Sequence, residues 1–172
     1  MKNRLTIAIQ KGGRLSDQSK DLIKKSGISF STKGDKLLAK SNNLPIDILF
    51  VRDDDIPSLV SNGDADLAIV GENVLIEKTL FKENNTVKVL DLGFSKCRLS
   101  IAAPDNKKNM RLANKKIATS YPNILKKYLA DNNINATVTN IHGSVELTPY
   151  IGMSDCICDL VSSGATLEAN NL

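Results

Sequence analysis

The sequence predicts an α/β fold in which strands and helices alternate along the chain. Short apolar runs of strand length recur, helix-length patterns follow most of them, and glycines or prolines separate the two. Alternation of this kind is typical of parallel sheets covered by helices. With 172 residues, the chain suits one large domain or two small lobes. Because it has no Trp and only 4% aromatic residues, the core must be mainly aliphatic.

Three strand and helix pairs are expected in the first half. Buried apolar runs predict strands at residues 5–10, 46–51 and 65–71, and end signals predict helices at 16–27, 56–63 and 72–80. Ser16 is the expected N-cap of the first helix, and Gly27 lies just past its end. Pro57 suits the first turn of the second helix, which Gly63 would end.

The second half continues the alternation. The strands are expected at residues 87–94, 97–104, 115–120, 136–141 and 155–161. The helices are expected at residues 121–133 and 143–152, with a last one starting near Thr166. Ser120 or Tyr121 would lie at the start of the first of these helices, with Pro122 in its first turn.

Composition and charge exclude several classes of function. A net charge of +4, with lysines spread through the chain and few aromatics, does not favour nucleic-acid binding. The N-terminus has only a short apolar run, which does not favour a secretory signal, and no run approaches the ~20 apolar residues of a membrane span. We therefore expect a cytoplasmic protein. Its three cysteines, Cys97, Cys156 and Cys158, are interpreted as buried free thiols.

Polar residues follow the predicted strands where ligands collect in α/β sheets. Cations, acids or small glycine turns stand at six strand ends: residues 10–14, 52–55, 71–73, 119–121, 143–146 and 159–166. The set indicates one cleft assembled from many loops.

The stretch DLVSSGATL, residues 159–167, is typical of a phosphate-binding loop. Gly164 and its small neighbours let several backbone N–H groups converge, and Ser163 and Thr166 add hydroxyl donors. A helix starting near Thr166 would aim its positive end at the same point. Asp159 could accept hydrogen bonds from vicinal sugar hydroxyls. The alternative is a capped turn that binds nothing.

Three other strand ends are open to two interpretations. In QKGGRL, Lys11 and Arg14 could contact a second polyphosphate, or they could be solvated cations beside a glycine turn. In VRDDDIP, residues 53–55 suggest Mg²⁺, yet helix capping is expected for at least one of the three carboxylates. Glu72 in GENV could be functional or could only favour the first turn of its helix.

The sequence lacks the common catalytic motifs. His142 is the only histidine, and no Ser-His-Asp, Cys-His or G-x-S-x-G arrangement is present. The Walker and G-x-G-x-x-G motifs are also missing. An enzyme with this sequence would work by positioning anions and stabilising charge rather than through a covalent nucleophile.

Seven segments together resemble the ATP phosphoribosyltransferase family, which begins histidine biosynthesis. They are LTIAIQKGGRLS, PIDILFVRDDDIP, DLAIVGENVL, LGFSKCRLSIA, KKIATSYPNILKKYL, GSVE and DCICDLVSSGATLEANNL, in the family's order from residue 5 to 172. The resemblance implies a two-lobed α/β fold like that of type II periplasmic binding proteins, with the active site in the cleft between lobes. It also implies transfer of the phosphoribosyl group of 5-phosphoribosyl diphosphate (PRPP) to N1 of ATP, with Mg²⁺ and release of pyrophosphate.

The resemblance also implies roles for individual residues. Asp159 would contact the ribose hydroxyls of PRPP, and the loop after it would hold the 5-phosphate. The residues expected to bind PRPP are Asp159, Ser162, Ser163, Gly164, Ala165 and Thr166. The residues expected to bind ATP are Lys11, Arg14, Glu72, Tyr121 and Glu146. Members of the family are homo-oligomers, with dimers assembling to a hexamer, so a homo-oligomer is expected here.

The chain departs from the family pattern in wording and length. Gly12 stands where members usually read QKSGRL, Ser163 where they read STGATL, and GSVELTP replaces GSVEVAP. Serine keeps the hydroxyl at position 163, so phosphate binding should survive. We expect a first lobe at 1–93 and a second at 94–172, without the return segment and the regulatory domain of the family's long form, which the motifs match better than the short form.

Two alternatives remain open at this point. One is a non-catalytic small-anion binding protein of the periplasmic-binding-protein fold, although two phosphate-friendly loops exceed what one solute needs. The other is a fragment that does not fold, which a broad, non-cooperative melting transition would indicate.

Overall fold

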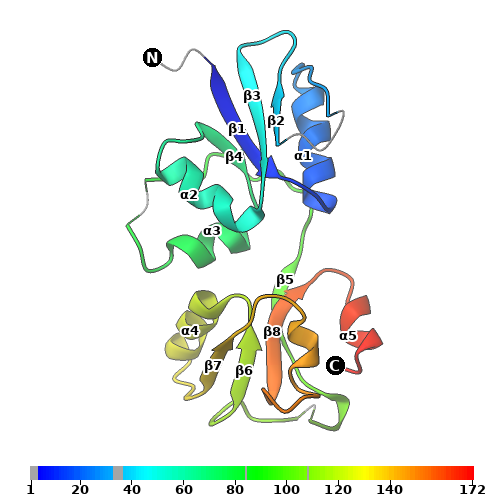
Figure 1. Cartoon of the computed structure of the whole chain (residues 1–172). Coiled ribbons are helices and arrows are strands. Elements are labelled where there is room, and N and C mark those ends of the chain that lie inside the picture. Colours follow the sequence, from blue (N-terminus) through cyan, green and yellow to red (C-terminus); the bar gives the residue numbers. More distant parts are fainter. Residues whose placement is uncertain (1–3, 33–36, 84, 108) are drawn as a thin grey trace. The chain divides into compact units, whose positions relative to one another are not determined.

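The computed structural model describes residues 4–32, 37–83, 85–107 and 109–172. The chain divides into two compact units, Met1–Ser95 and Lys96–Leu172, each built on its own four-stranded sheet (Figure 1). The expected lobe boundary, between residues 93 and 94, lies two residues before this division. The fold is mixed α/β, as the alternation of strands and helices predicts.

The sheet of the first unit has the order β2-β3-β1-β4. Its strands are β1 (Leu5–Gln10), β2 (Leu38–Lys40), β3 (Ile46–Val51) and β4 (Leu67–Ile69). The central strand β1 runs parallel to β3 and β4, whereas β2 pairs antiparallel with β3. The three parallel strands are those expected from the sequence, and β2 is an unpredicted edge strand of three residues.

The helices of this unit are α1 (Arg14–Lys25), α2 (Ile56–Ser61) and α3 (Glu72–Thr79), with a 3₁₀ turn η1 (Asp53–Asp55) before α2. The strand β1 has apolar side chains on both faces, so α1 covers one face of this sheet and α2 covers the other, with α3 packed against α2. Ile7 and Ile9 pack in a cluster with Ile23 of α1, whereas Ala8 packs on the opposite face with Ile56 of α2.

The first helix begins earlier than predicted. Gly13, not Ser16, is the N-cap of α1, and Ser16 is fully buried inside the first turn. Gly13 adopts φ 84° and ψ 178°, a conformation open to glycine but not to other residues, so the chain can turn into the helix at Arg14. The predicted end of the helix is confirmed, with Gly27 at φ 83° just past it.

The strand predicted at 87–94 is wrong. Residues 85–94 form no strand, and the side chains of Val87 and Val89 are each 82% exposed. Their β-branched pattern is strand-like, but a strand also needs a hydrogen-bonded neighbour, and none lies beside this segment in the part of the chain that the structure describes.

The second unit is built on a sheet of order β5-β8-β6-β7. Its strands are β5 (Arg98–Ala102), β6 (Lys116–Thr119), β7 (Thr137–Asn140) and β8 (Cys156–Val161). The strand β6 runs parallel to β7 and β8, and β5 pairs antiparallel with β8. The helices are α4 (Pro122–Asp131) and α5 (Ala165–Ala169), with the 3₁₀ turns η2 (Asp105–Lys107) and η3 (Val145–Leu147).

The helix predicted at 143–152 is also wrong. Only η3 is helical there, and the rest forms turns. Gly143 and Ser144 both have positive φ, 85° and 49°, which a right-handed helix does not allow. Val145 nevertheless packs in the core with Ala118 and Ile157, so the apolar pattern of the segment reflects packing rather than a helix.

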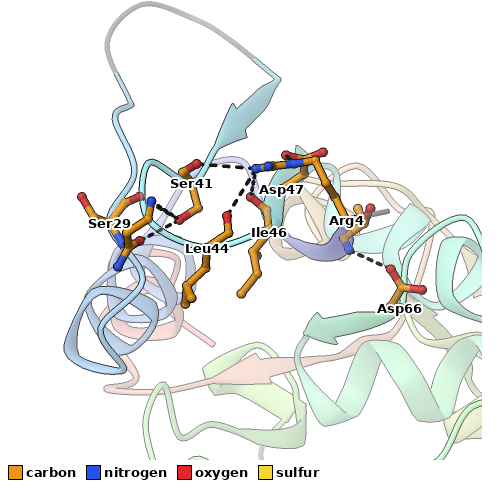
Figure 2. A network of polar contacts seen from close by, with 9 residues as sticks. Arg4, Ser29, Ser41, Leu44, Ile46, Asp47 and Asp66 are labelled. Atoms are coloured by element: carbon orange, nitrogen blue, oxygen red, sulfur yellow. Dashed lines mark hydrogen bonds and ion pairs between the residues drawn. The ribbon is translucent and has the colours of Figure 1, made fainter. Parts of the chain in front are cut away.

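Arg4 ties the amino ends of β1 and β3 together in the first unit (Figure 2). Its Nε donates to Asp47 Oδ1 at 2.8 Å, and its Nη2 donates to the carbonyl of Ile46 at 2.8 Å. On the other side of β1, the backbone N–H of Thr6 donates to Asp66 at 2.7 Å. These contacts lie at the end of the sheet opposite to the carboxyl ends of its parallel strands.

The structure confirms the interpretation of the cysteines as buried free thiols for two of the three. All three cysteines are free thiols, but only Cys156 and Cys158 are buried; Cys97 is exposed because it precedes β5 instead of lying within it. Burial raises the pKa of the Cys156 thiol to about 11, which makes it a poor nucleophile.

The helices of the described residues are too short or too polar to cross a bilayer.

Candidate functional site

The carboxyl ends of three parallel strands form one edge of the second unit. Because β6, β7 and β8 run in the same direction, their last residues, Thr119, Asn140 and Val161, lie along this edge (Figure 1). Six predicted site residues lie in the last part of β8, in the loop that follows it or at the start of α5. Two more follow β6 and β7. Together these residues are Asp159, Ser162, Ser163, Gly164, Ala165 and Thr166 with Tyr121 and Glu146.

The loop after β8 turns at a left-handed glycine. Gly164 adopts φ 90° and ψ −9°, a left-handed conformation that turns the chain sharply. The N–H of Ala165 donates to the Ser163 hydroxyl at 3.3 Å, which folds the loop on itself. Ser162, Ser163 and Thr166 are exposed.

The helix that follows is shorter than the phosphate-loop pattern suggests. α5 begins at Ala165, one residue before the predicted position, and has five residues. Because so short a helix sums few peptide dipoles, its positive end adds little to anion binding. The exposed hydroxyls of the segment are those of Ser162, Ser163 and Thr166.

Asp159 is a half-buried carboxylate in β8, one residue past the last β6–β8 pair. Burial raises its pKa above the ordinary value of 3.8, and the negative charge of Glu146 raises it further. The N–H of Leu160 opposes this shift by donating to Asp159 Oδ1 at 2.7 Å. Two carboxylates thus act on each other at the same edge as the phosphate-type loop.

The loops after β6 and β7 are joined by hydroxyl and backbone contacts. The Ser120 hydroxyl donates to the carbonyl of Ile141 at 2.7 Å, and the N–H of Ile141 donates to the carbonyl of Thr119 at 3.0 Å. The N–H of Tyr121, the N-cap of α4, donates to Thr119 Oγ1 at 2.9 Å. The predicted start of this helix is confirmed, with Pro122 in its first turn.

The first unit presents its own edge of carboxyl strand ends. The N–H of Lys11 donates to the carbonyl of Val51, the last residue of β3, at 2.8 Å. Arg14 and Glu72 are the first residues of α1 and α3. The structure brings these three predicted ATP-binding residues to one edge of the first unit, whereas Tyr121 and Glu146 belong to the second unit.

Glu72 is paired within the protein. Lys88 lies 2.7 Å from Glu72 and 2.7 Å from Asp91, and hydrogen bonds to Asp91 and Glu72 raise the pKa of Lys88 to about 12. All three groups are largely exposed, so the pair is screened by water. The ion-pair partner of Glu72 is therefore Lys88, a residue outside the predicted site.

The acidic run at 53–55 makes no side-chain capping hydrogen bond, although Asp55 occupies the N-cap position of α2. Neither η1 nor α2 has a side-chain cap; Asp53 accepts from the N–H of Asp54, and Asp54 lies 3.5 Å from Lys78. The expected capping is therefore met in position by Asp55 but not by a carboxylate hydrogen bond, because the chain enters α2 through a 3₁₀ turn. Among the described residues, no three or more His, Cys, Asp or Glu side chains are placed to hold a metal ion.

Comparisons with known proteins agree on one family. Residues 52–172 match the sequence model described as HisG, ATP phosphoribosyltransferase. The chain is 53% identical over 174 aligned positions to an ATP phosphoribosyltransferase from Cytophaga hutchinsonii. That alignment covers 98% of this chain and 58% of the relative, so the chain spans little more than half of the relative's length.

Solved structures agree on the fold. The ATP phosphoribosyl transferase (HisG:HisZ) complex from Thermotoga maritima superimposes with a TM-score of 0.80 at 31% identity, covering 97% of this chain and 79% of the other. The alkanesulfonate-binding protein SsuA from Xanthomonas axonopodis pv. citri, bound to MOPS, gives a TM-score of 0.57 at 16% identity, over 98% and 58% of the two chains. At such low identity, the second match concerns the fold alone, which is the periplasmic-binding-protein type expected from the sequence.

Proposed function

The chain belongs to the ATP phosphoribosyltransferase family, and on that premise we propose that it binds PRPP and ATP and transfers the phosphoribosyl group to N1 of the adenine. The product would be N1-(5-phosphoribosyl)-ATP, with pyrophosphate released, in the committed step of histidine biosynthesis. The single observation that carries the proposal is the edge of the second unit, where Asp159 stands beside the loop 162–166.

This edge suits the sugar phosphate half of PRPP. The backbone N–H groups around Gly164 and the hydroxyls of Ser163 and Thr166 would hold the 5-phosphate. Asp159 would accept hydrogen bonds from the ribose hydroxyls. Because the charge of Glu146 acts on Asp159, we propose that Glu146 faces the same sugar, in place of the ATP contact expected from the resemblance.

The chemistry requires positioning and charge rather than a protein nucleophile. The lone pair on adenine N1 forms the new bond to C1 of the ribose, and the bond from C1 to the diphosphate oxygen breaks with its electron pair leaving on pyrophosphate. The sugar carries positive charge as the bond breaks. Two carboxylates at one face of the sugar, Asp159 and Glu146, would stabilise that charge electrostatically.

The remaining predicted residues suit the polyphosphates. Lys11 and Arg14 would bind the triphosphate of ATP, the arginine in a two-pronged fashion. Glu72 and Tyr121 would contact the rest of the nucleotide. Since the described carboxylates form no metal cage, we propose that Mg²⁺ enters bound to the diphosphate of PRPP, as part of the substrate.

Assembly and location follow as proposals from the same premise. We propose that the protein self-associates, which light scattering on the purified chain would test across a concentration series. A cytoplasmic location is proposed because ATP and PRPP are cytoplasmic metabolites. The alternative of a non-catalytic anion-binding protein is not favoured, because the family match is to an enzyme and the likeness to SsuA concerns the fold alone.

A turnover assay tests the proposal directly. The chain is mixed with ATP, PRPP and Mg²⁺, pyrophosphatase is added to pull the equilibrium, and the absorbance of N1-substituted adenine is followed. A signal that requires all three reactants supports the enzyme. If there is no turnover, calorimetry with Mg-PRPP decides whether the site exists: the unchanged chain should bind, and Asp159→Ala should not. Binding that survives Asp159→Ala would remove the site from this edge.

A further inference from the structure

Ser120 occupies a special place between two loops of the candidate edge. It follows β6 directly, and its half-buried hydroxyl donates to the carbonyl of Ile141, 21 residues further along the chain, at 2.7 Å. A backbone bond from Ile141 to Thr119 lies next to it. The hydroxyl thus fixes the point at which the chain leaves β7.

The turn that begins at this point is exposed and left-handed, and the carbonyl of Ser144 accepts from the N–H of Leu147 at 3.2 Å. His142, Gly143 and Ser144 are all exposed, and the latter two have positive φ values of 85° and 49°. A left-handed conformation is unfavourable for serine, so this turn persists only if its surroundings impose it. The turn leads to buried Val145, so its geometry sets how η3 enters the core, and Glu146 is the next residue.

Glu146 is the residue whose direction this turn decides. It lies within η3, which packs against β8 through Val145 and Ile157, and its charge acts on Asp159 of the same strand. A shift at Ile141 would pass through the exposed turn and change where the Glu146 carboxylate points. The hydrogen of the Ser120 hydroxyl is already donated to a backbone carbonyl, so it is not available as a donor to a ligand.

We propose that Ser120 is a positioning residue, whose hydrogen bond to the Ile141 carbonyl sets the 142–144 turn so that Glu146 and Asp159 converge on one ribose. The role rests on the proposed binding of PRPP at this edge. In this role, the serine of the ATSYPN segment acts on the substrate only indirectly, by positioning Glu146.

Calorimetry with Mg-PRPP on three variants tests this role. Ser120→Ala should weaken binding about fivefold, the size expected for the loss of one net hydrogen bond. Ser120→Thr keeps the donor and should bind like the unchanged chain. Ser41→Ala is the matched control, because the Ser41 hydroxyl also donates to a distant backbone carbonyl, that of Ser29 at 3.0 Å, but at the amino end of the first sheet. It should lower the melting temperature without changing the affinity.

A second measurement needs no ligand. NMR titration of the side-chain carboxyl of Asp159 should show its raised pKa falling in Ser120→Ala, as Glu146 turns away, and remaining raised in Ser120→Thr and Ser41→Ala. A purely structural role would lower stability in Ser120→Ala without moving this titration. If the alanine variant does not fold, Ser120→Cys takes its place, since a thiol has similar volume and donates weakly.

The outcomes separate the two proposals. If the unchanged chain binds Mg-PRPP and Ser120→Ala binds equally well, the positioning role is overturned while the proposed function stands. A threonine variant as weak as the alanine variant would overturn it as well. If the unchanged chain does not bind Mg-PRPP, the proposed function fails, and the titration alone then decides: an unchanged Asp159 titration in Ser120→Ala overturns the role, and a lowered one supports it.

Discussion

The charge of Glu146, in the 3₁₀ turn after β7, acts on the carboxyl group of Asp159 in β8 and helps to raise its pKa. Burial is the larger cause of the same shift. Both effects disfavour the charged form of Asp159. Ionisation of this carboxyl group at neutral pH therefore lowers the free energy of unfolding. A charged carboxylate at position 159 therefore lowers the stability of the fold.

Asp159→Asn should stabilise the fold at neutral pH. A raised pKa means that the stability contribution of this group is complete below its ordinary value of 3.8 and is lost as the pH rises through the raised pKa. Asparagine removes the charge and can still accept from the N–H of Leu160. The melting temperature should rise at pH 7 and match the unchanged chain near pH 3. Asp131→Asn, on the exposed end of α4, is the control, and a lower melting temperature for Asp159→Asn at pH 7 would contradict the argument.

Asp155 should behave in the opposite way. It lies directly before β8, and its Oδ2 accepts from the N–H of Lys116 at 2.9 Å, which together with nearby lysines lowers its pKa. Its contribution is present above the ordinary value of 3.8 and is lost as the pH falls through the lowered pKa. Asp155→Ala should cost about 1 kcal/mol in urea unfolding at pH 7. The loss should shrink in acid.

The control for Asp155 is an exposed ion pair. Asp21 lies 2.7 Å from Lys25 on α1, with both side chains mostly in water, so Asp21→Ala should change stability by less than about 0.5 kcal/mol. Equal effects of the two substitutions would mean that the backbone hydrogen bond of Asp155 contributes nothing beyond surface charge.

Much of the fold could be predicted because its strands carry local evidence. The alternation of Ile7, Ala8 and Ile9 is that of a strand buried on both faces, and the structure packs these residues on opposite sides of β1. Prediction failed where local pattern and tertiary context disagree. The segment with Val87 and Val89 has the composition of a strand but no neighbour among the described residues, and β2, with a lysine among its three residues, has a neighbour but little pattern.

Gly164→Ala should damage the loop after β8 through its backbone and not through a clash. A Cβ at this position would meet no atom within 4 Å, but φ is 90°, which costs an alanine about 1–2 kcal/mol. Relief of that strain would deform the loop, so Mg-PRPP affinity should fall by about 5- to 30-fold, the factor to which this free energy corresponds. Calorimetry measures this directly.

Gly12 provides the matched control for Gly164. A Cβ added at Gly12 would also meet no atom within 4 Å, yet the φ of Gly12 is not in the left-handed region. Gly12→Ser, which introduces the residue that the family usually carries there, should leave the melting temperature within about 2 °C and the fold unchanged. If Gly12→Ser lowered the Mg-PRPP affinity as much as Gly164→Ala, the loop after β8 would have no special backbone requirement.

The candidate site was predictable in position but not in its internal contacts. Strand ends can be read from apolar runs, so Asp159 and the loop 162–166 fall where the sequence places them. The effect of the Glu146 charge on Asp159 and the bond from Ser120 to Ile141 couple segments that belong to different strands and loops. Such contacts depend on strand order, β8-β6-β7, which a single sequence does not specify.

Arg4 should be the surface residue whose loss most weakens the first unit. It joins β1 to β3 through Asp47, whose side chain is only 17% exposed, and through the carbonyl of Ile46. Arg4→Ala would leave a mostly buried carboxylate without this partner, at a cost of about 1–2 kcal/mol after allowance for the partial exposure of Arg4. Arg4→Lys should recover only part of this, because an ammonium cannot donate in two fixed directions. Urea unfolding measures both variants, with the exposed Arg52→Ala as the control. A loss for Arg4→Ala no larger than that of the control would mean that water replaces these hydrogen bonds without cost, and that packing along β1 alone holds the sheet together.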